Sequence, residues 1–357
     1  MDDAVRMSLA EVHEASRRAL LAKGFSPPHA EAIAATMTAA ERDGSHHHGL
    51  FRLAFYASAL EAGQASPDAE PTFEDLAPGV IRCDAGGAFA PLALELSAPR
   101  LVERARSPGI AALALNDALP VAPLGIEVER LAAEGLAAFA FVCAIPYVAP
   151  HGGTRPVFGT NPVAFGWPRP DRPPLVIDMA SSMSARGEIQ IRMRDGRSLP
   201  EGWAIDADGR PTTDPKAALA GAQLPFGGAK GSAIALMVEL LAGPLVGDVI
   251  SLEAGERDPA KTGAPRGGEL VIAMDPARFT RGGDLPERLA RGERLFRAIL
   301  EQEGTRLPGD RRYASRARAE REGVLVPRSI HDSLVALAAG AGYARQPWEG
   351  DPASPSS

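Results

Sequence analysis

The N-terminal part of the chain carries apolar residues at helical spacing. The run Ser8-Leu9-Ala10-Glu11 is a capping-box pattern, and the helical spacing that follows it continues to Gly24, which offers a left-handed stop. Ser26-Pro27 then supplies an N-cap and a first helical residue, and the apolar positions after it continue to Asp43. The pattern predicts that residues 1–60 form a helical block.

From about Gly79 the pattern changes to short apolar runs typical of buried strands. We expect strands at 80–83, 110–115, 138–142, 175–179 and 269–273, and amphipathic helices at 92–105, 126–134, 230–241 and 285–303. The segment 146–174 is dense in Gly, Pro and Thr, which predicts an ordered loop system that exposes backbone groups. The chain is therefore predicted to be an α+β protein.

These boundaries suggest how the chain is organised. We expect a helical domain over 1–75, a sheet domain over 76–280, a helical C-terminal part over 281–345 and a disordered tail over 346–357. No internal repeat, Gly-x-Gly-x-x-Gly pattern or Walker-type pattern is present, so the sequence does not support a Rossmann domain.

Composition narrows the possible partners. A net charge of -7 argues against a nucleic-acid or anionic-membrane surface, and no run of about 18 apolar residues predicts a membrane span. We therefore expect a cytoplasmic protein with a small-molecule substrate. Cys83 and Cys143 lie in apolar stretches and are predicted to be buried, reduced thiols, which excludes a metal site built mainly from sulfur.

The run Glu41 to Arg52 concentrates imidazole and guanidinium groups. If a helix begins near Gly49 and buries Phe51, Tyr56 and Leu60, then His48 lies at its start and Arg52 lies one turn further along the same side. A proton donor and a carboxylate-binding group would then face one pocket. A metal site is not expected at His46-His47-His48, because adjacent side chains point apart and no acidic or cysteine cluster completes the ligand set.

Several separate strings in the same order resemble one known family. They are Glu41-Arg42-Asp43-Gly44, His48-Gly49-Leu50-Phe51-Arg52, Phe158-Gly159-Thr160-Asn161-Pro162 and Leu224-Pro225-Phe226-Gly227-Gly228. The chain resembles the malate/L-lactate dehydrogenase family without a Rossmann fold, which includes ureidoglycolate and sulfolactate dehydrogenases. Within it the chain looks closest to the delta-1-piperideine-2-carboxylate/delta-1-pyrroline-2-carboxylate reductases. The resemblance implies a helical domain made from both chain ends, a mixed or antiparallel sheet domain that binds the nicotinamide cofactor, and a homodimer.

The same resemblance implies roles for individual residues. His48 would be the proton donor, with His47 in the adjacent relay position, and Arg52 and Thr160 would contact the substrate. Glu188 could be the carboxylate that orients the histidine. The implied cofactor contacts are Pro120, Val121, Ala122, Pro123, Leu124, Asp178, Met179, Ala180, Lys230, Arg306, Arg311 and Arg312. Arg311 and Arg312 are candidate partners for a 2'-phosphate, which would favour NADPH over NADH.

Three departures from the family pattern fall in these regions. His47 replaces the serine of a Ser-His-Gly triplet, Pro120 to Gly125 replaces His-Phe-Ala-Ala-Leu-Trp, and Ala229 replaces the histidine of Gly-Gly-His-Lys-Gly. Two prolines in the second segment also remove backbone donors. The three departures together have three possible interpretations: a changed substrate, weakened nucleotide binding, or a site that now serves another reaction.

Simpler interpretations exist for the same residues. Arg52 would form a surface salt bridge with Glu61 or another acid, and Thr160 would cap a turn. Asp178 would be a structural acid at the end of a strand. A lysine at a helix N-terminus opposes the helix dipole, which favours a ligand-facing role for Lys230.

The sequence therefore predicts an NAD(P)H-dependent reductase of a small cyclic 2-imino acid. A planar acid needs its carboxylate held, which arginine does bidentately, and the reduced group needs a proton, which an imidazole can supply. A 2-oxo or 2-hydroxy acid dehydrogenase is the nearest alternative. A lyase, isomerase or cyclase that no longer uses the cofactor, and a catalytically silent homologue, are the others.

Overall fold

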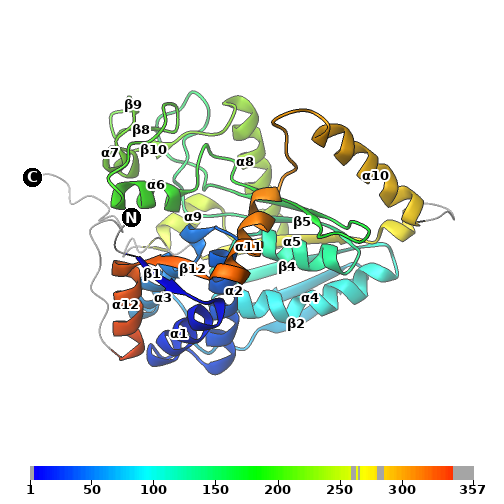
Figure 1. The fold of residues 1–357 in the computed structure, drawn as a ribbon, viewed down its shortest axis with the longest axis horizontal. Coiled ribbons are helices and arrows are strands. Elements are labelled where there is room, and N and C mark those ends of the chain that lie inside the picture. Colours follow the sequence, from blue (N-terminus) through cyan, green and yellow to red (C-terminus); the bar gives the residue numbers. More distant parts are fainter. Residues whose placement is uncertain (1–3, 259–262, 264–265, 280–284, 341–357) are drawn as a thin grey trace, which may run out of the picture.

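A seven-stranded mixed sheet forms the centre of the molecule in the computed structural model, which describes residues 4–258, 263, 266–279 and 285–340 (Figure 1). The strand order is β2-β3-β4-β11-β5-β6-β7. Among the described pairings, β3 and β4 run parallel and the other neighbours run antiparallel. The strands are β2 (Thr72–Ala77), β3 (Val80–Asp84), β4 (Ile110–Ala118), β5 (Ala137–Val142), β6 (Val163–Trp167), β7 (Leu175–Met179) and β11 (Gly267–Met274).

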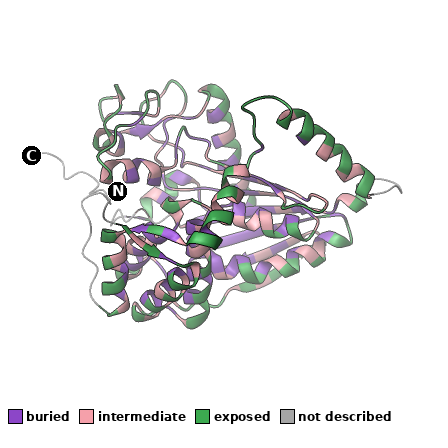
Figure 2. Ribbon diagram, viewed as in Figure 1, coloured by how far each residue is buried: buried purple, intermediate pink, exposed green. Residues whose placement is uncertain are grey.

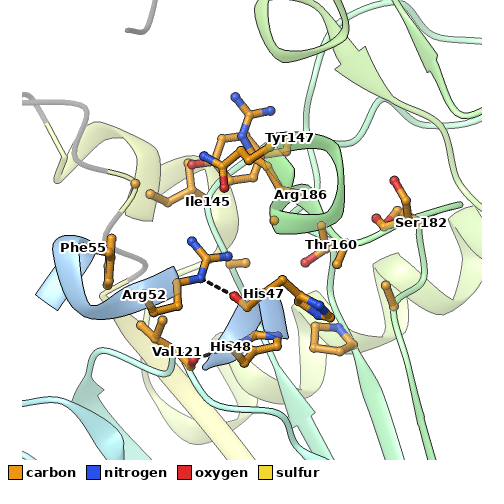
Figure 3. A pocket seen from close by; sticks show the side chains of 18 of the residues that line it. His47, His48, Arg52, Phe55, Val121, Ile145, Tyr147, Thr160, Ser182 and Arg186 are labelled. Atoms are coloured by element: carbon orange, nitrogen blue, oxygen red, sulfur yellow. Dashed lines mark hydrogen bonds between the residues drawn. The ribbon is translucent and has the colours of Figure 1, made fainter. Parts of the chain in front are cut away.

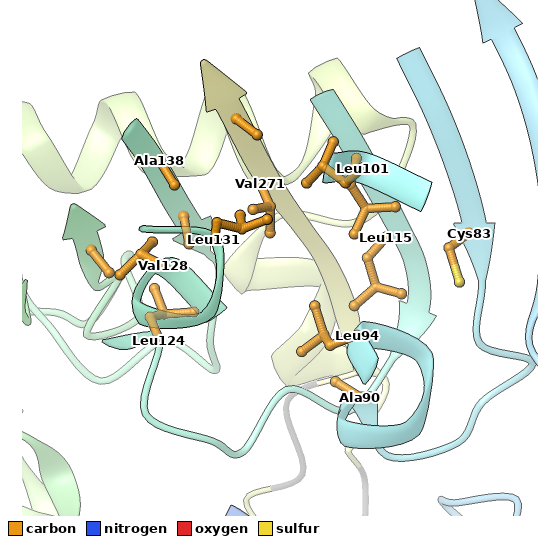
Figure 4. Packing of buried hydrophobic residues seen from close by; sticks show 14 of the residues in the cluster. Cys83, Ala90, Leu94, Leu101, Leu115, Leu124, Val128, Leu131, Ala138 and Val271 are labelled. Carbon is orange, nitrogen blue, oxygen red and sulfur yellow. The ribbon is translucent and has the colours of Figure 1, made fainter. Parts of the chain in front are cut away.

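Helices cover both faces of this sheet. Side chains alternate between the two faces of a strand, so Leu113 and Leu115 of β4 pack in a different cluster from Ala114. The first cluster contains residues of α4 (Ala90–Arg106) and α5 (Gly125–Ala133), as Figure 4 shows for Leu94, Leu101, Leu124 and Leu131. The second contains residues of α8 (Ala229–Ala242). The apolar runs of the central strands follow from this double burial.

The two ends of the chain meet beside the sheet. Strand β1 (Ala4–Met7) pairs antiparallel with β12 (Val324–Pro327), and α1 (Leu9–Ala22) packs on α2 (Pro27–Arg42) and α12 (Arg328–Ala338). Helix α3 (Leu53–Glu61) adds the buried Tyr56 to this core, and α11 (Asp310–Glu322) crosses α2. Figure 2 shows that the inner sides of these elements are buried.

A small lobe packs next to the helical part. It contains the sheet β10-β8-β9, with β8 (Ala204–Ile205), β9 (Pro211–Thr212) and β10 (Ala222–Gln223), and the helices α6 (Arg186–Arg194) and α7 (Pro215–Ala220). Helix α9 (Ser251–Glu256) follows the 3-10 turn η3 (Pro244–Val246), and η4 (Pro276–Arg278) follows β11. Helix α10 (Leu285–Leu300) projects from the molecule, and its Phe296 packs with Leu175 and Leu307 (Figure 1).

The predicted helices and strands are largely confirmed. Ser8 accepts a hydrogen bond from the backbone of Glu11, whose carboxylate accepts from the backbone of Ser8, as the capping box requires. Gly24 has a φ of 94°. Both cysteines are free and buried.

Three local predictions were wrong. The block 1–60 is not all helical, because β1 lies within it, and the pairing partner of this strand is more than 300 residues away in the sequence. The α-helix does not begin near Gly49. Two 3-10 turns, η1 (His46–His48) and η2 (Leu50–Arg52), precede α3. The segment 146–174 contains the strand β6, whose five residues between prolines gave little periodic signal.

Helix α8 is unusually apolar. The segment Ala229–Val246 is long and apolar enough by composition to cross a membrane, which is weak evidence because the core helix of a soluble protein meets the same criterion. In the structure α8 ends at Ala242, and its Val238 packs against the sheet. Its other side leaves large apolar residues exposed, namely Leu236, Met237 and Leu240. The predicted disordered tail 346–357 lies outside the described residues.

Candidate active site

A single large cavity brings together most of the predicted site residues. Its volume is about 1690 Å³, above the 300 to 1,000 Å³ typical of sites for drug-sized ligands. The predicted residues that line it are His47, His48, Arg52, Pro120, Val121, Ala122, Pro123, Leu124, Thr160, Asp178, Met179, Ala180, Arg311 and Arg312. These residues come from the helical ends, the main sheet and the loops between them, so the cavity exists only in the assembled fold (Figure 3).

Three predicted residues do not line this cavity. Glu188 lies in the first turn of α6, and its carboxylate accepts a hydrogen bond from Arg192 at 3.1 Å. Lys230 lies exposed in the first turn of α8, and Arg306 lies exposed before α11. The structure therefore brings none of these three to the cavity wall, and their roles stay predictions.

Glu41 holds the backbone that presents the histidines. Its buried carboxylate accepts a hydrogen bond from the backbone of Leu50 at 2.8 Å and lies 2.6 Å from Nδ1 of His46. A Cβ at Gly49 would lie 2.1 Å from the Glu41 carboxylate, so only glycine allows this close approach. This contact explains why the chain forms two 3-10 turns here, and it leaves His46 outside the cavity wall.

His48 faces the cavity with one ring nitrogen already engaged. Its Nδ1 lies 3.0 Å from the backbone carbonyl of Val121. Because a carbonyl only accepts, Nδ1 carries the proton in the neutral ring, and Nε2 is left for proton exchange with a ligand. Burial holds the pKa of His48 well below its ordinary value, and the neighbouring His47 and Arg52 lower it further. Without a ligand, His48 is therefore neutral at pH 7.

His47 lies against His48 in the same wall. The two ring centroids are 4.5 Å apart, with the planes tilted by 53°. Burial lowers the pKa of His47 to about 4, and the positive charge of Arg52 contributes to this shift. His47 is thus a second neutral imidazole at the position where a hydroxyl was expected.

Arg52 is held in place by backbone rather than by an acid. Its Nε donates to the carbonyl of His47 at 2.8 Å, which fixes the direction of the side chain. The salt bridge with Glu61 considered above does not form, since Glu61 pairs with Lys23. A Cβ at Gly187 would lie 2.9 Å from Arg52 Nη2, so α6 approaches the guanidinium closely. Arg52 can direct free donors at a carboxylate in the cavity.

A buried polar network supports Thr160. Asn161, at a φ of 36°, donates from its side chain to the carboxylate of Glu239 at 2.7 Å. The same carboxylate accepts from the backbone and the hydroxyl of Ser251, and that hydroxyl accepts from the backbone of Gly159 at 3.0 Å. The Thr160 carbonyl accepts from Ser181, whereas the Thr160 hydroxyl makes no hydrogen bond within the described part of the chain. The network therefore leaves that hydroxyl available to a ligand.

The end of β7 forms the part of the wall predicted for the cofactor. Asp178 accepts from the backbone of Gly125 at 2.9 Å and from Arg312 at 3.1 Å, so it also has a structural role. A Cβ at Gly125 would lie 2.1 Å from the Arg312 guanidinium, whose Nη1 is buried without a partner. Arg311 is exposed at the cavity wall and forms no ion pair with any described residue. These guanidinium groups fit an anionic nucleotide.

The structure shows what surrounds two of the three positions that depart from the family pattern. In the segment 120–124, the group that contacts His48 is the carbonyl of Val121, which a changed side chain does not remove. Ala229 begins α8 away from the cavity wall, and the ring of His151 lies next to the preceding Gly228. The segment 120–124 thus still holds His48.

Two residues of the wall were missed by the sequence analysis. The guanidinium of Arg186 lies 3.8 Å from the ring centroid of Tyr147, and both side chains line the cavity (Figure 3). Arg186 follows the N-cap of α6, where a cation opposes the helix dipole. The same reasoning was applied to Lys230 and would have singled out Arg186 as well.

Comparison with known proteins establishes the family. The profile of the malate/L-lactate dehydrogenase family matches residues 7–335. The chain belongs to this family. The family resemblance inferred from the separate strings is thereby confirmed.

Individual relatives cover nearly the whole chain. The delta-1-pyrroline-2-carboxylate/delta-1-piperideine-2-carboxylate reductase of Pseudomonas aeruginosa is 51% identical over 333 residues, which cover 93% of this chain and 99% of that protein. The (2R)-3-sulfolactate dehydrogenase (NADP+) of Chromohalobacter salexigens is 43% identical over 93% of this chain and 98% of its own length. The crystal structure of delta-1-piperideine-2-carboxylate reductase from Pseudomonas syringae pv. tomato superposes with a TM-score of 0.87 at 40% identity, covering 93% of this chain and 99% of that one.

Proposed function

We propose that the protein is an NAD(P)H-dependent reductase of small cyclic 2-imino acids such as piperideine- or pyrroline-2-carboxylate. The observation that carries the proposal is that His48 and Arg52 line the same cavity as the residues predicted to contact the cofactor. The names of the Pseudomonas relatives, both reductases of such imines, support the same substrate class.

In this proposal Arg52 binds the substrate carboxylate. Its Nε is held by the His47 carbonyl, so the two terminal nitrogens meet the planar acid in a bidentate arrangement. Thr160, in the loop before β6, contacts the same substrate through its hydroxyl. Orientation by these groups sets the C=N bond at a fixed place in the cavity.

His48 supplies the proton to the imine nitrogen. A nicotinamide cofactor, when bound, would supply the hydride that the ring carbon accepts. Nδ1 of His48 stays engaged with Val121, so the proton passes through Nε2. A bound carboxylate offsets the charge of Arg52, which raises the pKa of His48 from its low value in the free enzyme. Substrate binding thus makes His48 a better proton carrier. His47 keeps its predicted relay position beside His48 in this proposal. Glu188 does not orient His48, since Nδ1 of His48 is held by the Val121 carbonyl and the Glu188 carboxylate accepts from Arg192.

We further propose NADPH as the preferred cofactor, held by residues 120–124, 178–180, Lys230, Arg306, Arg311 and Arg312. The exposed guanidinium of Arg311 suits a phosphate group, and the sulfolactate dehydrogenase relative is an NADP+ enzyme by its name. The domain boundaries given above, with a helical part made from both ends, belong to the same proposal.

The protein is also proposed to be a cytoplasmic homodimer that binds neither nucleic acid nor membrane. The side chains of Leu236, Leu240 and Leu245 are 50%, 55% and 65% exposed around α8. An apolar patch of this kind on a folded protein favours contact with another protein surface. A second copy of this chain would cover it.

A comparison of substrates tests the proposed function. Oxidation of NADPH and NADH is followed with delta-1-piperideine-2-carboxylate, delta-1-pyrroline-2-carboxylate and pyruvate. We expect kcat/KM for the cyclic imines to exceed that for pyruvate by about 100-fold or more, since a site that binds a ring nitrogen rejects an acid without one. Preference for pyruvate would identify a 2-oxo acid dehydrogenase instead. No oxidation with any acid would indicate a lyase, isomerase or cyclase on this fold.

A further inference from the structure

Two guanidinium groups line the cavity besides Arg311 and Arg312, which belong to the part predicted for the cofactor. Arg52 comes from η2 and Arg186 from the first turn of α6, and both line the cavity wall. Arg186 Nη2 donates to the carbonyl of Leu219 at 3.0 Å, and its guanidinium stacks on Tyr147. Each arginine is therefore fixed at one side and directs its remaining donors into the cavity.

Neither guanidinium has a carboxylate partner within the described residues. The acids that line the cavity, Asp178, Glu256 and Asp258, form no ion pair with either group. Burial lowers the pKa of both arginines, and the charge of Arg186 lowers that of Arg52 further. Holding two unpaired cations in one partly buried space is unfavourable, so the arrangement is stabilised when anionic groups enter the cavity.

The two guanidinium groups lie at different parts of the cavity wall. Gly187 of α6 approaches Arg52, but the Arg186 side chain extends away from Arg52 and lies beside Tyr147 (Figure 3). The Leu219 carbonyl that holds Arg186 belongs to α7, and Lys216 of the same helix also lines the cavity. One carboxylate bound at Arg52 leaves Arg186 without a counterion.

We infer that the site accepts a cyclic 2-imino acid with a second carboxylate, which Arg186 binds. The inference rests on the proposed function and extends it to imino diacids, with Arg52 holding the carboxylate next to the C=N bond. The Tyr147 ring, whose centroid lies 3.8 Å from the guanidinium carbon, and the Leu219 carbonyl hold Arg186 in place, which leaves its other N–H donors for the distal group.

A matched pair of substrates isolates this contact. Delta-1-piperideine-2-carboxylate and delta-1-piperideine-2,6-dicarboxylate share the ring and the C=N bond and differ by one carboxylate. We expect the wild-type enzyme to reduce both, with a lower KM for the diacid. In Arg186→Leu, the KM for the diacid rises about tenfold or more, whereas the KM for the monoacid changes by less than about threefold.

Two further variants control for structural effects. Arg186→Lys keeps the charge but not the flat donor edge, so it recovers part of the diacid preference. Arg194→Gln removes a cation from the last turn of the same helix, where it pairs with Asp195 outside the cavity wall, and leaves both KM values unchanged. In Arg52→Lys the KM rises for both substrates.

Binding of unreactive analogues keeps this test separate from the reductase assay. Picolinate and pyridine-2,6-dicarboxylate are titrated calorimetrically into the same proteins, and Arg186→Leu weakens only the second. Equal effects of Arg186→Leu on monoacid and diacid, no effect on either, or no wild-type binding of the diacids would each overturn the inference. If the diacid analogue binds through Arg186 but no imine is reduced, the inferred anion site stands and the proposed function fails.

Discussion

At the scale of single residues, the structure adds a protonation state that the sequence could not provide. The predicted proton donor is a neutral imidazole in the free protein, because burial outweighs the single backbone hydrogen bond that favours its charged form. His46, two residues earlier, has the opposite environment, since its contact with Glu41 raises its pKa. His46 and His48 lie in the same short turn but differ in charge, because the surrounding fold gives them different neighbours.

This contrast predicts a titration order. In the free protein His46 gains its proton above pH 6.5, His48 below it, and His47 at about pH 4. The charged fraction of His48 therefore falls as pH rises through its low pKa, and reduction slows with it. Nitrogen-15 NMR of the three rings measures the order directly. Saturating picolinate should raise the pKa of His48, and a pKa of 7 or above in the free protein would contradict this account.

The residue scale also shows the limit of pattern matching. His48, Arg52 and Thr160 were found because they lie within recognisable strings, and the structure places all three on one cavity. Arg186 was missed although its place at a helix N-terminus was a sequence signal, and its contacts with Tyr147 and Leu219 are seen only in the fold. Glu188 was named for its spacing alone, and in the structure it pairs with Arg192.

At the scale of elements, regular helices and buried strands could be predicted and irregular segments could not. The helix start at Ser8 follows from its capping box. The start after Ser26 follows from Pro27 at the first helical position, since the Ser26 side chain makes no capping hydrogen bond. The turns η1 and η2 depend instead on the buried Glu41, which precedes them by several residues and holds their backbone. The short strand β1 forms only because its distant partner β12 is present, and β6 forms because it pairs with β5 and β7 on its two sides.

The loop that carries Thr160 gives a prediction at this scale. Glu239→Ala removes the acceptor of the Ser251 backbone and the shorter of the two contacts of its hydroxyl, and it leaves the Asn161 amide only its bond to the Ala235 carbonyl. We expect the free energy of unfolding to fall by about 3 kcal/mol, since each buried unpaired group costs about 1 to 3 kcal/mol. The KM for the imine should rise as Thr160 moves. Urea unfolding and initial rates measure the two effects.

Ser251→Ala is the graded comparison for this loop. It removes the hydroxyl, which donates to Glu239 and accepts from the Gly159 backbone, but it keeps the carboxylate and its bonds to Asn161 and the Ser251 backbone. Its loss of stability should therefore be smaller than that of Glu239→Ala. Unchanged stability in Glu239→Ala would show that the network does not support the loop.

At the scale of the whole molecule, the family and the α+β fold could be predicted because several strings appear in the right order over nearly the full length. Comparison with known proteins confirms both. The cavity itself could not be predicted, because its walls come from the two chain ends, the central sheet and the small lobe. The assembled fold decides whether the changed segment Pro120 to Gly125 leaves room for a nucleotide. A cavity of about 1690 Å³ is present.

The central claim is that the protein catalyses hydride transfer to a cyclic imino acid that is bound in this cavity between His48 and Arg52. The most direct measurement uses NADPH with deuterium at the transferable position of C4, delta-1-pyrroline-2-carboxylate as substrate, and mass spectrometry of the product. We expect wild-type protein to form proline with one deuterium, and His48→Ala to form it with kcat reduced by about 100-fold or more. Proline without deuterium, or no proline at all, would contradict the claim.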